Sequence, residues 1–223
     1  MTFSLLGACR RTGRLGLVVA SSSPAVAARC AHVRPRVGIA ASQNVTDPRL
    51  GPALLDALER GGDVDAALAE VVGAAPQVEH RQLVLLDARG TAAAHSGAAA
   101  LGIHGHRIGD GCAAAGNLLA AEDVLDAMVA AFERDARSEL GDRLVGALAA
   151  ALEAGGEAGP VRSAGLVMTG DVDWPIADLR VDWHDAPVGA LAELWAVYAP
   201  QLDDYVARAL EPASAPGYGV PGE

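Results

Sequence analysis

The chain contains no lysine, and all 17 of its basic residues are arginine. This absence excludes a lysine-dependent phosphate loop, Schiff-base chemistry and a lysine general base, because each of these needs an ε-amino group. Arginine cannot serve as a base in its place, since its guanidinium stays protonated and only donates hydrogen bonds. A nucleophile in this protein must therefore find its proton acceptor elsewhere.

Aromatic residues and cysteines are also scarce. Aromatic residues make up 4% of the 223 residues while 51% are hydrophobic, so the core must be built mainly from closely packed Leu, Val and Ala. The cysteines are Cys9, Cys30 and Cys112, which are odd in number and widely spaced. This pattern predicts reduced, buried thiols rather than a disulfide framework or a zinc site.

No apolar run approaches the length of about 20 residues that a membrane span requires. The net charge of -11 argues against general nucleic-acid binding. Arg10-Arg11 before the apolar residues 15–20 resembles a twin-arginine export signal, but that run is shorter than the roughly 7 to 15 residues a signal needs. We expect a cytoplasmic protein with no membrane or nucleic-acid partner, and export with a mature start near Ala28 is the alternative.

Apolar periodicity predicts strands, a helix pair, strands, a second helix pair and final strands. The predicted strands are 3–8, 15–20, 37–41, 81–87, 91–96, 108–117, 164–169 and 176–183, and residues 25–36 read as irregular. The first two strands form a hairpin, and the third is expected beside it in the same sheet. The predicted helices begin at Asp47-Pro48 and after Asp63, then cover 122–134, 139–154 with Leu152 facing inward, and 188–210 with a break at Pro200. This order favours an α+β fold with two packed sheets between helical layers. We expect one domain over 1–210 and a disordered tail over 211–223.

The first strand begins at the chain terminus, where Thr2 becomes the first residue if Met1 is removed. A terminal threonine carries a hydroxyl nucleophile and a free α-amine that can act as its general base. Such an amine has a reference pKa of about 7.7 to 8.0, so part of it is neutral near physiological pH. Many chains begin Met-Thr without any catalytic role, and the alternative is a frayed terminus.

Six arginines and no acidic residue lie between Met1 and Arg36, which makes a local positive region in an acidic protein. Solvated turns would explain this region. The more specific alternative is a positive pocket that attracts a carboxylate-bearing substrate.

Several segments together resemble the bacterial domain-of-unknown-function family 1028. They are residues 1–4, 12–21, 42–43, 47–51, 95–97, 105–111, 116–119 and 178–182. That family is grouped with the N-terminal-nucleophile (Ntn) hydrolases, so the resemblance implies a four-layer α-β-β-α sandwich, Thr2 as nucleophile and hydrolysis of a linear amide. The chain departs from the family pattern at Ser22-Ser23-Pro24 and at Asp47-Pro48, and both departures leave a changed substrate open.

Supporting roles are assigned to polar residues within these segments. Asn117 is the candidate donor to the oxyanion, because its amide donates without titrating; a turn asparagine is the alternative. The candidate substrate-binding residues are Ser21, Ser42, Gln43, Arg81 and His95. The Arg81 guanidinium could clamp a carboxylate, although an exposed ion pair is commoner. His95, His104 and His106 lack the nearby carboxylate or thiolate that a metal site needs, so we expect no metal and no cofactor.

The sequence thus predicts an Ntn hydrolase that cleaves a small, carboxylate- or ureido-bearing linear amide and forms a homo-oligomer. The rival is a catalytically silent protein of the same fold that binds a small molecule or acts as a scaffold. Retention of Met1 would favour the rival, because it would lock the Thr2 amine in a peptide bond.

Overall fold

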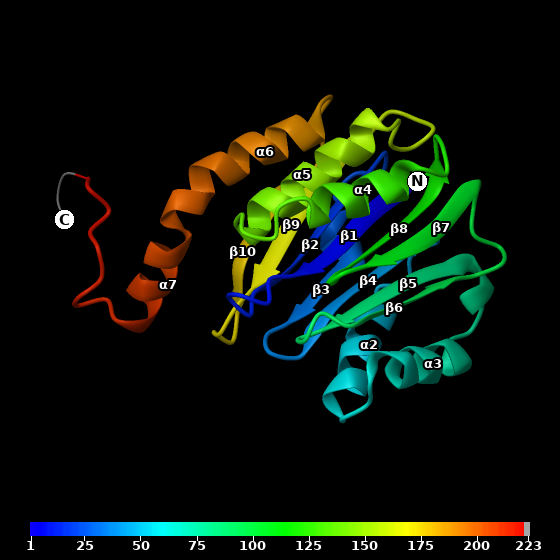
Figure 1. The fold of residues 1–223 in the computed structure, drawn as a ribbon, viewed down its shortest axis with the longest axis horizontal. Coiled ribbons are helices and arrows are strands. Elements are labelled where there is room, and N and C mark those ends of the chain that lie inside the picture. Colours follow the sequence, from blue (N-terminus) through cyan, green and yellow to red (C-terminus); the bar gives the residue numbers. More distant parts are fainter. Residues whose placement is uncertain (221–223) are drawn as a thin grey trace.

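The computed structural model describes residues 1–220 and contains two β-sheets packed face to face between layers of helices (Figure 1). The larger sheet is antiparallel throughout. In spatial order its strands are β10 (Pro175–Val181), β9 (Ser163–Thr169), β2 (Leu15–Ser21), β1 (Thr2–Ala8), β8 (Cys112–Leu119) and β7 (Ile103–Gly109). The N-terminal strand therefore lies inside the sheet, between β2 and β8.

The smaller sheet is also antiparallel. Its strands are, in order, β3 (Ala31–Arg34), β4 (Gly38–Asn44), β5 (Arg81–Asp87) and β6 (Ala92–Ser96). Helices α2 (Leu50–Glu59) and α3 (Val64–Ala74) cover its outer face. Helices α4 (Val124–Glu133), α5 (Leu140–Glu153) and α6 (Pro187–Tyr198) cover the outer face of the larger sheet.

Three apolar layers hold these elements together, as strand periodicity requires. Successive strand residues point to opposite faces, so one strand supplies two layers. In β1, Phe3 and Leu5 pack under the helices of the larger sheet, while Leu6 and Ala8 pack between the sheets. A third layer joins the smaller sheet to α2 and α3. The predicted α+β fold is therefore correct, with the four layers in the order α-β-β-α.

Most predicted elements are present with small boundary changes. The β1–β2 hairpin is confirmed. The helix after Asp63 is confirmed as α3, and the Asp63 side chain accepts a hydrogen bond from the Ala66 amide as an N-cap. The predicted break near Pro200 separates α6 from α7 (Leu202–Leu210) by a short 3-10 turn, Ala199–Gln201.

Four local predictions were wrong. Residues 25–36 contain the short helix α1 (Ala27–Cys30) and strand β3. Residues 108–117 are part of a hairpin, β7–β8, that turns where Gly111 takes a positive φ of 69°. Strand β4 belongs to the smaller sheet rather than lying beside the first hairpin. Leu152, predicted to face inward, is 44% exposed because it lies in the last turn of α5.

The end of the described chain has no helix or strand after Leu210. Arg208 of α7 nevertheless donates hydrogen bonds to the carbonyl oxygens of Pro216 and Gly217. Disorder of residues 211–223 stays a prediction, and 221–223 lie outside the described residues. Among residues 1–220, no helix is both long and apolar enough to cross a membrane.

Candidate active site

The space between the two sheets changes from apolar to polar at one end. Along the inner face of β1, Ala8 and Leu6 are apolar and are followed by Ser4 and Thr2, all buried. The same change occurs on the strands around β1. The inner-facing polar residues at this end are Ser21 of β2, Asn117 of β8, Gln43 of β4, Gln82 of β5 and Ser96 of β6.

Thr2 is at the centre of this polar end and is only 5% exposed. Its Oγ1 donates a hydrogen bond to the Met1 carbonyl oxygen at 2.6 Å and lies 3.3 Å from Ser21 Oγ. Ser21 Oγ donates to the same Met1 oxygen. The hydroxyl groups of Thr2, the candidate nucleophile, and of Ser21 thus share the Met1 carbonyl oxygen.

Hydrogen bonds tie the polar residues of the two sheets into one network. Ser4 Oγ donates to Gln43 Oε1 at 2.7 Å, and Gln43 Nε2 donates to Gln82 Oε1 at 3.3 Å. Gln82 Nε2 then donates to Ser96 Oγ at 3.1 Å and to the Gly116 carbonyl at 2.9 Å. Because a buried polar group without a partner is costly, this network fixes the orientation of each amide.

Asn117 is paired with Thr2 across the β1–β8 ladder and is fully buried. Its Nδ2 donates to Gln82 Oε1 at 3.0 Å, whereas its Oδ1 has no hydrogen-bond partner. A side-chain amide has two N–H donors. One Asn117 donor is therefore used in the network, and one N–H and the carbonyl oxygen are left for other groups.

Glu157 is a residue of this region that the sequence did not single out. It forms a β-bridge with Leu119, the last residue of β8, and it is only 4% exposed. Neither carboxylate oxygen has a well-formed hydrogen bond. Burial raises the pKa of Glu157 to about 7, while the N-terminal ammonium and Ser22 act in the opposite direction. No local motif marks this acid, because its burial depends on the fold of the loop after α5.

Three predicted site residues face away from the polar end. Ser42, Arg81 and His95 lie on strands whose inner faces carry Gln43, Gln82 and Ser96, so alternation turns them toward α2 and α3. Ser42 Oγ donates to the Asp47 carbonyl at 2.9 Å. Arg81 donates to the Val45 carbonyl, and His95 Nε2 is buried without a partner. The structure does not bring these three side chains to Thr2.

The arginine-rich start of the chain does not form a positive pocket. Arg10 pairs with Asp110, and Arg11 and Arg14 pair with Glu139. These arginines lie in the β1–β2 turn, at the opposite end of β1 from Thr2. Arg34 and Arg36 likewise pair with acids, namely Asp56, Glu59 and Asp173, and Arg29 donates to the backbone carbonyls of Pro24 and Ala25. The prediction of a carboxylate-bearing substrate, which depended on these arginines, therefore loses its basis.

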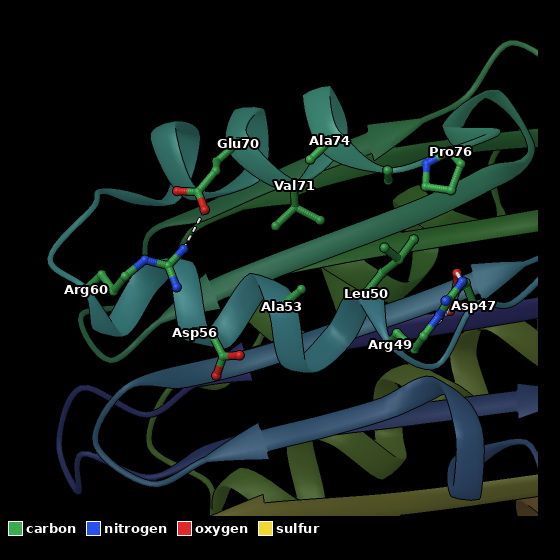
Figure 2. A pocket seen from close by; sticks show the side chains of 11 residues that line it. Asp47, Arg49, Leu50, Ala53, Asp56, Arg60, Glu70, Val71, Ala74 and Pro76 are labelled. Carbon is green, nitrogen blue, oxygen red and sulfur yellow. Dashed lines mark hydrogen bonds and ion pairs between the residues drawn. The ribbon is translucent and has the colours of Figure 1, made fainter.

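A cavity of about 370 Å³ lies between α2 and α3, on the outer side of the smaller sheet. Figure 2 shows the Arg60–Glu70 pair at one end of this cavity and Asp47 with Arg49 at the other. Hydrogen bonds from Arg49 hold the pKa of Asp47 at about 2. The chain departs from the family pattern at two places. At the first, Asp47 lines this outer cavity. At the second, Ser22 lies next to Glu157.

The three histidines named in the sequence make separate contacts. His106 Nδ1 lies 3.1 Å from Ser96 Oγ, and His104 Nδ1 lies 2.8 Å from the Gly102 carbonyl oxygen. Burial, with Arg107 and His95 as smaller influences, lowers the pKa of His106. His106 therefore extends the polar network at the Ser96 end.

The fold and this polar end together define a class of protein: an α-β-β-α sandwich that holds a threonine from the start of the chain between its two sheets. The family model described as a family of unknown function, DUF1028, matches residues 2–191. The chain belongs to this family. A comparison with curated proteins gives no match.

Solved structures resemble the chain to different degrees. Protein SPO2555 from Silicibacter pomeroyi, also of family DUF1028, is 30% identical with a TM-score of 0.84, over 92% of this chain and 89% of that one. Anbu (ancestral beta-subunit) from Yersinia bercovieri is 12% identical with a TM-score of 0.42, over 98% and 100% of the two chains. An Anbu (Gly-1) mutant from Hyphomicrobium sp. strain MC1 is 10% identical with a TM-score of 0.43, over 90% and 96%. The last two likenesses are weak, and the four-layer fold rests on this chain's own sheets and helices.

Proposed function

We propose that this protein is an N-terminal-nucleophile hydrolase that cleaves a linear amide of a small molecule, with Thr2 as the nucleophile after removal of Met1. The observation that carries the proposal is the position of the Thr2 hydroxyl. It lies buried at the polar end of the space between the sheets, 3.3 Å from Ser21 Oγ and on the residue that pairs with Asn117 in the β1–β8 ladder.

The proposed reaction needs no base other than the chain's own amine. Thr2 Oγ1 attacks the substrate carbonyl carbon, and its proton moves to the Thr2 α-amine. The resulting ammonium gives that proton to the leaving nitrogen as the carbon–nitrogen bond breaks, which leaves an ester on Thr2. Water then attacks the ester with the amine again as base, and a carboxylic acid leaves. The absence of lysine makes the α-amine the one primary amine of the sequence.

Ser21 and Asn117 are the proposed donors to the oxyanion. Ser21 donates to the Met1 carbonyl oxygen, so removal of Met1 would free this donor beside Thr2. Asn117 lies opposite Thr2 and keeps one N–H outside the network, although its first N–H is held by Gln82. Neutral donors fixed in a buried site stabilise developing negative charge without a large reorganisation. Gln43 is proposed to support this arrangement by holding Ser4, rather than by contacting substrate.

The test is covalent labelling of the mature protein by a β-lactone, an electrophile that acylates hydroxyl nucleophiles. Intact mass is measured first, to establish whether the chain begins at Thr2. We expect one adduct, mapped to Thr2, in the wild type and in Thr2→Ser, and none in Thr2→Ala. Labelling that is equal in the wild type and in Thr2→Ala, or a chain that keeps Met1 in its active form, would overturn the proposal.

The rival function, binding without turnover, predicts a different result. A silent protein of this fold would bind a small amide without accumulating or turning over an ester at Thr2. A screen of small linear amides for release of the amine product separates the two, because only the hydrolase makes a product that is lost in Thr2→Ala.

A further inference from the structure

The region beside Thr2 contains a buried acid with no assigned partner. Glu157 is 4% exposed, and both of its carboxylate oxygens are inaccessible and lack a well-formed hydrogen bond, with Ser22 as the nearest donor. A buried carboxylate without a partner is strongly unfavourable, so an acid kept at such a place points to a cation or donor that binds there.

The loop that carries Glu157 lies against the start of the chain, which brings the N-terminal ammonium into consideration as that cation. The neighbouring Gly156 packs against the ring of Phe3 in β1, and Gly159 packs against the Met1 side chain. The loop that carries Glu157 therefore wraps the start of the chain. Against the raising effect of burial, the positive charge of the N-terminal ammonium lowers the pKa of the Glu157 carboxyl, and the hydroxyl and the backbone N–H of Ser22 act in the same direction by hydrogen bonding.

We propose that the Glu157 carboxylate binds the N-terminal ammonium of the chain and, once Thr2 is exposed, positions its α-amine beside the Thr2 hydroxyl. Glu157 is then a positioning residue, because it acts on the reaction through the amine. This inference rests on the proposed function for its catalytic meaning, but the ion pair itself can be measured without any turnover.

The absence of lysine makes the measurement specific. Reductive methylation with ¹³C-formaldehyde modifies primary amines, and here it gives the NMR signal of a single site, the N-terminus. The chemical shift of that signal is followed against pH in the wild type, in Glu157→Gln and in Glu153→Gln. Glu153 is a matched control, since it is an exposed acid near the end of α5 and its replacement changes the net charge equally.

We expect the titration midpoint of the amine to move to lower pH by about one in Glu157→Gln, because a nearby opposite charge favours the charged form of an amine. The midpoint in Glu153→Gln should stay at the wild-type value. An unchanged midpoint in Glu157→Gln, or an equal change in both variants, would overturn the proposal. Thermal unfolding of all three proteins confirms that each is folded at the pH values used.

A second readout separates this inference from the proposed function. The pH dependence of β-lactone labelling of Thr2 should shift in Glu157→Gln in the same direction as the amine midpoint. If the wild type is not labelled but the amine midpoint still shifts, the hydrolase proposal fails and the ion pair stands. If Thr2 is labelled with the same pH dependence in all three proteins, the role of Glu157 fails and the nucleophile stands.

Discussion

At the scale of single residues, alternation along strands decides which polar side chains can meet Thr2. Gln43 and Ser42 are neighbours in β4, yet Gln43 joins the network between the sheets and Ser42 faces α2. The same reason separates Ser96 from His95 and Gln82 from Arg81. A substitution at either member of such a pair therefore tests a different layer of the molecule.

Glu157 should make stability depend on pH. Its folded pKa of about 7 lies above its ordinary value of 4.5. Its contribution is therefore fully present below pH 4.5 and is lost as pH rises through 7, because the ionised form is disfavoured in the folded state. The loss amounts to at most about 3 kcal/mol on the scale of 1.36 kcal/mol for each pKa unit.

Urea unfolding of the wild type and of Glu157→Gln at pH values from 4.5 to 8 checks this expectation. The unfolding free energy of the wild type should fall as pH rises over this range, and that of Glu157→Gln should not show this fall. Parallel curves for the two proteins would contradict it.

Gln82 connects the two sheets through its side-chain amide. In Gln82→Leu, donors and acceptors on Gln43, Asn117, Ser96 and Gly116 lose a buried partner. Each unsatisfied buried group costs about 1 to 3 kcal/mol. We expect a total destabilisation of several kcal/mol by urea unfolding, together with loss of Thr2 labelling. A change below about 0.5 kcal/mol, the size typical of surface substitutions, would show that the network does not hold the sheets.

At the scale of elements, the contact between α5 and α6 depends on a residue without a side chain. Gly141 of α5 lies under Trp195 of α6, and a Cβ at this position would come within 2.1 Å of the Trp195 ring. Trp195 Nε1 also donates to Asp142 at 2.7 Å, which fixes the ring over the glycine. Close approach, rather than helix propensity, explains a glycine in this helix.

Two glycine-to-alanine substitutions in α5 separate the effect of close packing from the effect of helix propensity. Gly141→Ala should destabilise the protein by about 1 to 3 kcal/mol, because the methyl group overpacks the contact with Trp195. Gly146→Ala meets no atom within 4 Å and should stabilise the same helix by up to about 1 kcal/mol through helix propensity. Thermal unfolding of the two variants should therefore give shifts of opposite sign, and shifts of the same sign would contradict the account of this packing.

At the scale of the whole molecule, the ordered sandwich ends with α7. Arg208 of α7 contacts Pro216, Gly217 and the ring of Tyr218 in the segment after Leu210. Because nearly all residues of 211–220 are exposed and add no helix or strand, deleting residues 211–223 should change the unfolding free energy by less than about 1 kcal/mol. A larger loss in urea unfolding would show that the tail belongs to the domain.

Self-association stays a prediction at this scale. Sedimentation velocity over a tenfold range of protein concentration measures it directly. We expect a species heavier than the 22.6 kDa chain at every concentration, whereas a monomer throughout would contradict the prediction of a homo-oligomer.

The sequence by itself determined most of the strands and helices, the four-layer class and the presence of Thr2, Ser21, Gln43 and Asn117 at strand ends, but not α1, β3 or the division of 108–117 into β7 and β8. These features follow from local periodicity and from short motifs, which depend on neighbouring residues and not on the tertiary structure. Strict alternation along a strand is also enough to place Ser42 and Gln43 on opposite faces of the sheet, because the two residues are consecutive.

Only the tertiary structure decided which strands face each other and which distant groups meet. The β7–β8 hairpin, the place of β4 in the second sheet and the pairing of the first arginines with distant acids depend on long-range packing. Glu157 comes from a loop more than 150 residues after Thr2 in the chain, yet the fold buries it against the last residue of β8, in a loop that packs on Met1 and Phe3. Glu157 is buried only because the layers of the sandwich pack around it, and no local pattern of residues predicts that packing.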